Sequence, residues 1–368
     1  MEDLAARQHE IATKLGRLRA RMVEHQLDVV TLNNIANVAW LTGGASTYVN
    51  MATENGIATV VVTAERAIIV TDRIEAPRLE QEEHLGELGF TFAVDPWYAR
   101  GGELARLIAG LRVGHDGPGT GHDLSADLRD LRTHLQPEDV TRIQAGGQLA
   151  AAAMQTALSD VHPGMPEYAV AARLAAASRE VGGVAVVNLV ASDARIAAFR
   201  HPLPSEKAVE RYLMAVLCLR KEGMIASVTR LIHFGPMPDE LRTKALAVAR
   251  VDARMIHGTQ PGRTMGEMFA LARQAYAEAG FPEAIEEHHQ GGSAGYQSRE
   301  VFALPDNPTQ IALHQAFAWN PSVRGVKSED TILTTDNGPV VLTAVDGWPT
   351  WDITVDGMTI ARPAIEER

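Results

Sequence analysis

The first half of the chain contains short apolar runs of the length expected for buried strands. Residues 27–32 form one such run, and residues 57–71 contain two more around a polar turn at residues 64–66. The Gly-rich residues 114–123 match neither a Walker loop nor a dinucleotide-binding fingerprint, so we predict a surface loop there. Strands that alternate with helical segments are typical of an α/β domain.

Helical periodicity fills the gaps between these predicted strands. The N-terminal segment has apolar residues at helical spacing, namely Leu4, Ile11, Leu15, Leu18 and Met22. Further helices are predicted over residues 75–87 and 103–111, and another from about Pro137. We therefore predict an α/β domain over residues 1–136.

The second half contains an internal repeat marked by proline and glycine. The same number of residues separates Pro163 from Gly182 and Pro261 from Gly280. In each copy a helix ends, a Pro-Gly turn follows, and a second helix stops at the later glycine. Two copies predict an α+β domain over residues 137–368 with approximate internal twofold symmetry and a site between the copies.

Strand pairs with hairpin turns accompany the two copies. Residues 212–219 and 224–234 flank a Lys-Glu-Gly turn. Asn-Gly at residues 337–338 and Asp-Gly at residues 356–357 each divide an apolar stretch in two. These dipeptides are strong signals for tight β-hairpins, so we predict three hairpins in this half.

Composition and charge exclude several classes of protein. A chain of 368 residues exceeds the usual size of one core, which agrees with two domains. The net charge of −12, without clustered Lys and Arg, argues against nucleic-acid binding. No apolar run has the length of a membrane span, and the charged N-terminus is unlike a secretory signal, so a cytoplasmic location is expected. The one cysteine, Cys218, excludes disulfides within the chain and cysteine-rich zinc sites.

Several segments resemble the creatinase, aminopeptidase P and prolidase family. They are LVASDARIAAFRHPLP (189–204), ASVTRLIHFG (226–235), HHQGGSAGYQSRE (288–300) and AFAWNPSVRGVKSEDTILTTDNGPVVLT (316–343). The first 135 residues resemble the smaller N-terminal domain of that family. The resemblance implies a pita-bread fold for the second domain, and family members are commonly homodimers.

The resemblance also implies where this chain departs from its family. Family metallopeptidases hold two divalent ions with two aspartates, one histidine and two glutamates. Matched residue by residue, four of these positions fall at Cys218, Ser227, Gly292 and Asn320, and only the last carboxylate is kept, as Glu329. Hard and borderline cations prefer carboxylate oxygen and imidazole ligands, and four of the five positions here have neither group. We therefore expect no metal pair and no cofactor.

Creatinase, which hydrolyses a C–N bond without metal, provides a precedent for the site. Its loop histidine matches His201, and a histidine of the family's substrate site matches His288. The predicted catalytic residues are His201, His288 and Glu329. The predicted substrate-binding residues are Glu300, Asn320, Ser227, His289 and Arg299. Neighbouring side chains of a strand point to opposite faces, so we expect only one of the two adjacent histidines in the site.

The predicted function is a metal-independent, creatinase-like hydrolase of a C–N bond in a small polar substrate, with Glu329 and Glu300 holding a cationic group. One alternative is an Xaa-Pro aminopeptidase-like or prolidase-like metallopeptidase with a rebuilt metal site. Another is a repurposed pita-bread protein, either a biosynthetic enzyme or a binding module. Ordinary structural roles also remain open: His201 as a solvated loop residue, Glu329 as an exposed strand start, and Glu300 as the ion-pair partner of Arg299.

Overall fold

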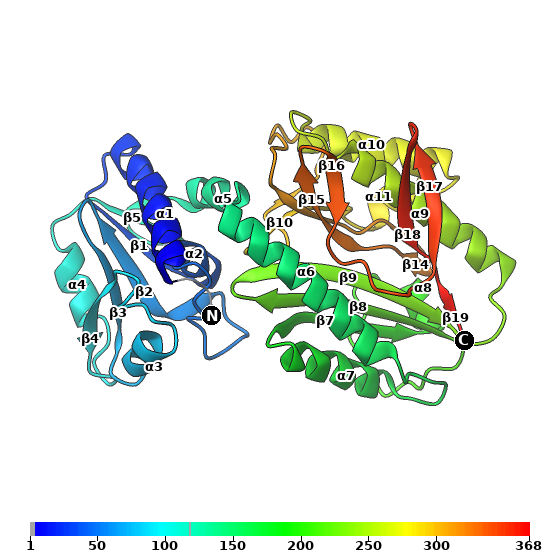
Figure 1. The fold of residues 1–368 in the computed structure, drawn as a ribbon, viewed down its shortest axis with the longest axis horizontal. Coiled ribbons are helices and arrows are strands. Elements are labelled where there is room, and N and C mark those ends of the chain that lie inside the picture. Colours follow the sequence, from blue (N-terminus) through cyan, green and yellow to red (C-terminus); the bar gives the residue numbers. More distant parts are fainter. Residues whose placement is uncertain (1–3, 118) are drawn as a thin grey trace. The chain divides into compact units, whose positions relative to one another are not determined.

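The computed structural model describes residues 4–117 and 119–368. The chain forms two compact units, Met1–Asp139 and Val140–Arg368. Figure 1 shows a sheet with helices in each unit. No helix in the described part of the chain is long and apolar enough to cross a bilayer.

The first unit is an α/β domain, as predicted. Its six-stranded sheet has the order β4-β3-β2-β1-β5-β6. The strands are β1 (Val29–Asn34), β2 (Asn55–Thr63), β3 (Ala67–Asp72), β4 (Thr91–Asp95), β5 (Val113–His115) and β6 (His122–Asp123). The helices are α1 (Leu4–Glu24), α2 (Ile35–Leu41), α3 (Ala76–Gln81), α4 (Gly102–Ile108) and α5 (Ser125–Thr133).

Local departures from the prediction concern the ends of elements in this unit. The helix predicted over 75–87 is a single short helix, α3, which ends at Gln81. The loop predicted over 114–123 contains the last two residues of β5 and the whole of β6, and its residue 118 lies outside the described residues. In α1, Ile11, Leu18 and Met22 are buried, as the helical spacing predicted.

The second unit is built around two larger sheets. Their orders are β19-β9-β8-β7 and β11-β10-β12-β15-β16, and β13-β14 and β17-β18 form separate pairs. The helices are α6 (Pro137–Leu158), α7 (Glu167–Glu180), α8 (Ala194–Ala198), α9 (Asp239–Gly258), α10 (Met265–Glu278) and α11 (Ala284–Glu287). The strands are β7 (Val184–Ser192), β8 (Tyr212–Lys221), β9 (Met224–His233), β10 (Gly291–Ala294), β11 (Val301–Phe302), β12 (Ala316–Trp319), β13 (Ser322–Val323), β14 (Val326–Lys327), β15 (Asp330–Thr335), β16 (Gly338–Val341), β17 (Thr350–Val355), β18 (Met358–Pro363) and β19 (Glu366–Glu367).

The internal repeat is present as predicted. Helices α7 and α10 have 14 residues each, and each is followed by a glycine in the left-handed region. The φ angles are 74° at Gly182 and 87° at Gly280, which glycine adopts without a steric penalty. The three predicted hairpins are also present, as β8-β9, β15-β16 and β17-β18.

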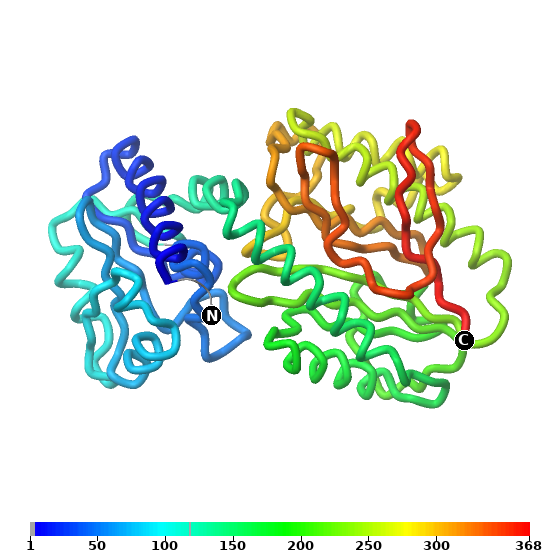
Figure 2. The backbone as a smooth tube through the Cα atoms, in the orientation of Figure 1, coloured from blue at the N-terminus to red at the C-terminus, as the bar shows by residue number. Residues whose placement is uncertain are grey.

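The two larger sheets meet along β9 and β15. A bridge between Thr229 and Glu329 joins them, and Figure 2 shows that the green and orange segments lie side by side there. All ten residues of β9 are buried, so polar side chains on this strand face the protein interior. The sites predicted on 218–230 and on 288–330 are therefore brought together by the sheet arrangement.

Candidate active site

The positions matched to the family's metal ligands lie on neighbouring strands. Cys218 and Ser227 are direct cross-strand partners of β8 and β9, with Sγ and Oγ 3.1 Å apart. Glu329, which directly precedes β15, forms an isolated bridge with Thr229, and its carbonyl accepts a hydrogen bond from the Thr229 amide over 3.0 Å. Cys218 is buried, as the apolar strand around it predicted, and burial raises the pKa of its thiol.

Glu329 lies at the centre of this group, and both of its carboxylate oxygens are engaged. Oε1 contacts Nη2 of Arg299 over 2.8 Å, while Oε2 contacts Nζ of Lys327 over 2.8 Å. The Thr229 hydroxyl also donates to Oε2 over 2.7 Å. Burial alone would raise the pKa of Glu329, but Lys327 and Arg299 outweigh it and lower the pKa to about 2.

Lys327 is a member of the site that sequence reasoning missed. A lysine before a charged strand start resembles a solvated surface residue, yet its side chain is 6% exposed. The available signal was the spacing of two residues between Lys327 and Glu329, which places both side chains on one face of an extended segment.

The residues at the ligand positions do not suit the metal pair of the family. One carboxylate, a thiol, a hydroxyl and an amide offer too little negative charge for two divalent ions. The remaining carboxylate of Glu329 is already bound by two cationic side chains. Arg299 also reaches Ser227, with Nη1 3.4 Å from Oγ, so the guanidinium spans two of the matched positions.

Gly292, matched to the metal-binding histidine, has no room for a side chain. An ideal Cβ there would lie 1.9 Å from the carbonyl oxygen of Val301 in the paired strand β11. Gly291 is equally confined, with a Cβ position 2.1 Å from the carbonyl oxygen of Ala318. These glycines therefore allow close approach of adjacent strands.

Three histidines converge beside this group. One ring nitrogen from each of His201, His288 and His289 lies within 4.8 Å of the other two. The expectation that only one of the adjacent histidines would face the site is wrong. Strand β10 begins at Gly291, so His288 and His289 precede the pleated part of the chain, and their rings stack with centroids 4.4 Å apart.

The environment keeps these histidines neutral at neutral pH. Burial lowers the pKa of His288 to about 2 and of His289 to about 4, with further contributions from Lys327 and Arg299 respectively. Burial and Lys327 also lower the pKa of His201, which is the exposed member of the cluster. Nδ1 of His288 and of His289 are buried without a hydrogen-bond partner among the described residues.

The other predicted substrate-binding residues lie around this centre. Asn320 is 2% exposed, and its Oδ1 has no partner within the described residues. Glu300 is buried and accepts a hydrogen bond from the Gln297 amide over 3.1 Å. The ion pair of Arg299 goes to Glu329, whereas the sequence suggested Glu300 as its partner.

A second buried ionic network includes Asp330, the residue after Glu329, and contains equal numbers of cationic and anionic side chains. Arg230 pairs with Asp330 over 3.0 Å, and Arg362 pairs with Asp330 and Asp252 over 2.6 and 2.7 Å. The sequence suggested a structural ion pair for Arg230, and the network gives it one. Two guanidinium groups here face two carboxylates.

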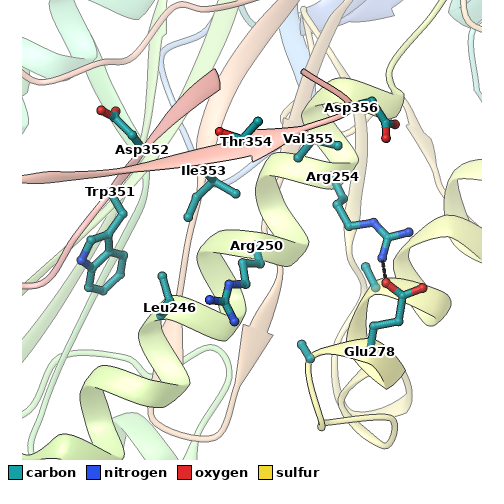
Figure 3. Close-up of a pocket in the computed structure, with 12 residues that line it drawn as sticks. Leu246, Arg250, Arg254, Glu278, Trp351, Asp352, Ile353, Thr354, Val355 and Asp356 are labelled. Carbon is teal, nitrogen blue, oxygen red and sulfur yellow. Dashed lines mark hydrogen bonds and ion pairs between the residues drawn. The ribbon is translucent and has the colours of Figure 1, made fainter. Parts of the chain in front are cut away.

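A groove of about 680 Å³ lies elsewhere in the second unit, between α9, α10 and β17. Figure 3 shows Arg250 and Arg254 on one side and Trp351 on another, with Arg254 paired to Glu278. None of the predicted site residues lines this groove.

Comparisons with known proteins agree with the two-unit fold. Residues 14–117 match the Creatinase/Prolidase N-terminal domain, and residues 141–336 match Metallopeptidase family M24. The prolidase of Pyrococcus horikoshii OT3 superposes with a TM-score of 0.77 at 21% identity, covering 91% of this chain and 99% of that chain. An Xaa-Pro dipeptidase from Bacillus anthracis gives a TM-score of 0.73 at 23% identity, covering 90% and 97%.

Sequence comparison finds similar proteins that are described as peptidases. An uncharacterized peptidase of Staphylococcus aureus (strain MW2) is 22% identical over 360 residues, covering 90% of this chain and 99% of the relative. The predicted fold, an α/β N-terminal domain followed by a pita-bread domain, is confirmed by these matches. Since the family match spans more than half of its residues, the chain belongs to metallopeptidase family M24.

Proposed function

We propose that this chain hydrolyses a C–N bond in a small substrate without the metal pair of its family. One observation carries the proposal: Arg299 and Lys327 both bind Glu329, the one carboxylate left at the matched ligand positions. Two fixed cationic side chains supply positive charge there, which in a metallopeptidase comes from the metal ions. A small-molecule substrate and a homodimer, both implied by the family resemblance, are part of the proposal.

His201 is the proton carrier in this mechanism. It is exposed at the edge of the histidine cluster, and its lowered pKa keeps it neutral and able to accept a proton at neutral pH. His201 takes a proton from water as the water oxygen bonds to the carbonyl carbon. The C–N bond then breaks, and the same proton passes to the leaving nitrogen.

His288 holds the proton carrier in place. Its Nε2 lies 3.1 Å from Nε2 of His201, within hydrogen-bond distance. With a pKa of about 2, His288 stays neutral over the whole working range of pH. The negative charge that develops on the carbonyl oxygen is stabilised by the nearby cationic side chains, of which Lys327 has donors to spare.

The test is turnover by the wild type and by His201→Ala on a panel of dipeptides, acyl amino acids and amidino compounds, in the presence of chelator. Turnover by the wild type that is lost in His201→Ala supports the proposal. Turnover at the wild-type rate in H201A contradicts the mechanism. Wild-type activity that needs an added divalent ion contradicts metal independence.

The histidine cluster favours a second candidate, a hydrolase with one metal ion held by His201, His288 and His289. Neutral imidazoles are good ligands, and three of them with an open position are typical of catalytic zinc. We rank this candidate second because two positive charges lie close to the cluster. Lys327 lowers the pKa of all three histidines, and Arg299 lowers those of His201 and His289. The same charges would repel a divalent cation. One tightly held equivalent of metal that disappears in H289A would favour it.

A further inference from the structure

We infer that His25, His122 and Asp127 form a binding site for zinc or a similar divalent transition metal in the first unit. The proposed active site lies in the second unit, so this inference goes beyond the proposed function. His25 directly follows α1, His122 opens β6, and Asp127 stands in the first turn of α5. Three elements therefore bring one ligand atom each to the same place, and each atom lies within 4.8 Å of the other two.

The spacing of His25 and Asp127 is that of two ligands of one ion. Nε2 of His25 lies 3.2 Å from Oδ2 of Asp127. This contact is not a hydrogen bond, because Nε2 is buried and has no hydrogen-bond partner among the residues that the structure describes. Two ligands of a tetrahedral zinc ion, with bonds of about 2.0–2.1 Å, are about 3.3 Å apart. An ion between the two atoms would also satisfy the buried nitrogen.

His122 is the exposed member of the group and supplies the third donor. Its ring lies beside that of His25, with centroids 4.3 Å apart and planes inclined at 33°. Because the side chain is exposed, it can rotate, and a shift of at most about 1.5 Å would bring its ring nitrogen to ligand spacing. A groove of about 600 Å³, lined by both histidines, gives an ion access to the site.

The ion pairs of Arg21 leave negative charge beside the site. This guanidinium is shared by the carboxylates of Glu24, Asp127 and Asp130, over 2.8, 3.7 and 3.0 Å. It approaches Asp127 at Oδ1, so Oδ2 is left for the side of His25. One cationic group therefore serves three anionic groups, and a divalent cation would offset the difference.

The other charged groups nearby do not remove this excess. Arg112 also lines the groove, but both branches of its guanidinium bind the carboxylate of Asp28, over 3.0 and 2.8 Å. Arg17 interacts with the same carboxylate group and adds one positive charge. Asp123, which directly follows His122, adds one negative charge. Carboxylates still outnumber guanidinium groups, so the surroundings attract a cation.

The donors identify the kind of ion. Two imidazoles and one carboxylate suit zinc and the neighbouring transition metals, whereas calcium and magnesium prefer oxygen ligands alone. Three protein ligands leave a fourth position for water. A bound ion would join the end of α1 to β6 and α5, so we expect it to stabilise the first unit.

The test titrates zinc chloride into the full chain carrying His201→Ala, which takes one ligand from the histidine cluster of the second unit. We expect one bound equivalent by calorimetry and a Tm that rises with zinc concentration. Adding His122→Ala or Asp127→Asn to this chain should weaken zinc binding at least about tenfold. Both residues are at least partly exposed, so in the presence of chelator these variants should keep the Tm of the parent.

His84→Ala is the matched control. His84 is an exposed histidine of the same unit and lies 3.3 Å from the carboxylate of Glu87, but it belongs to no group of three such ligands in the described part of the chain. This variant should bind zinc like the parent. No zinc binding by the parent, unchanged binding in H122A and D127N, or an equal loss in H84A would overturn the inference. Equal stabilisation by calcium chloride or magnesium chloride would overturn the assignment to a transition metal.

Discussion

The Nε2 atoms of His201 and His288 face each other at 3.1 Å, with His201 exposed and His288 buried. One of the two nitrogens must carry a proton for this contact to be a hydrogen bond. The buried ring therefore fixes the direction of the exposed one, and the exposed ring can exchange protons with solvent.

Replacing His201 with alanine should lower kcat by about 10²- to 10⁴-fold, the usual contribution of a general acid–base group. Thermal unfolding should change little, because an exposed loop side chain is removed. His9→Ala, at an exposed position of α1, is the control and should retain wild-type kcat and Tm. A large fall in Tm for H201A would point to a structural role instead.

Acidification should destabilise the protein, and His288 should account for part of the effect. Its pKa is about 2 in the folded chain and near 6.5 when unfolded, so the unfolded state binds more protons between these values. The free energy of unfolding therefore falls as pH drops below about 6.5. We expect the free energy of unfolding, measured in urea, to change less between pH 6.5 and 5 for His288→Gln than for the wild type.

The range between pH 6.5 and 5 separates the effect of His288 on stability from that of Glu329. The pKa of Glu329 is about 2, below its ordinary value of 4.5. Its stabilising contribution is present above pH 4.5 and is lost only as pH falls further. An identical dependence on pH in H288Q and wild type between pH 6.5 and 5 would rule out the histidine contribution.

Glu329→Gln should destabilise the protein by about 3–5 kcal/mol, because it leaves two buried cationic groups without a counter-charge. The double variant with Lys327→Met removes one of these charges and should recover part of that loss. Denaturant unfolding of both single variants and the double variant gives the coupling energy directly. Additive effects would show that Lys327 and Glu329 do not interact.

Gly292→Ala should be destabilising, because its Cβ would overlap the carbonyl of Val301 and force the two strands apart. We expect a loss of about 1–3 kcal/mol in the free energy of unfolding. Gly146→Ala is the control within α6, where a Cβ meets nothing within 4 Å and alanine favours the helix. Equal stability of the two variants would contradict the prediction, and would mean that β11 can move away from β10 at little cost in free energy.

Purified protein dialysed against manganese, zinc and iron should retain less than about a tenth of an equivalent of metal at the site. Elemental analysis checks this, with His122→Ala as a control. His122 belongs to a second group that can attract metal, with His25 and Asp127 in the first unit. Metal that is retained in H122A and lost in H289A would contradict metal independence.

Much of the fold follows from local signals in the sequence. Asn337-Gly338 and Asp356-Gly357 predicted their hairpins because few residues tolerate the backbone of such tight turns. The repeat was visible because glycine ends both α7 and α10. The short helix α3 was overestimated, since helical periodicity alone did not mark its end at Gln81.

The candidate site was harder to predict because its contacts are long-range. His201 and the two adjacent histidines are far apart in sequence, and the resemblance alone suggested them as neighbours. The pairing of Arg299 with Glu329 joins residues 30 positions apart, and no local pattern predicts it. Lys327 was missed because a charged residue beside a strand is normally solvated.

The close packing at Gly292 means that no single substitution can place a metal-binding histidine there without moving the backbone. The side chain of a histidine at this position would overlap the carbonyl oxygen of Val301, whether or not a metal ion were bound. The backbone of β11 would have to move first, and that movement brings no benefit by itself. A histidine at this position therefore requires a second change, one that moves the backbone of β11 away from β10.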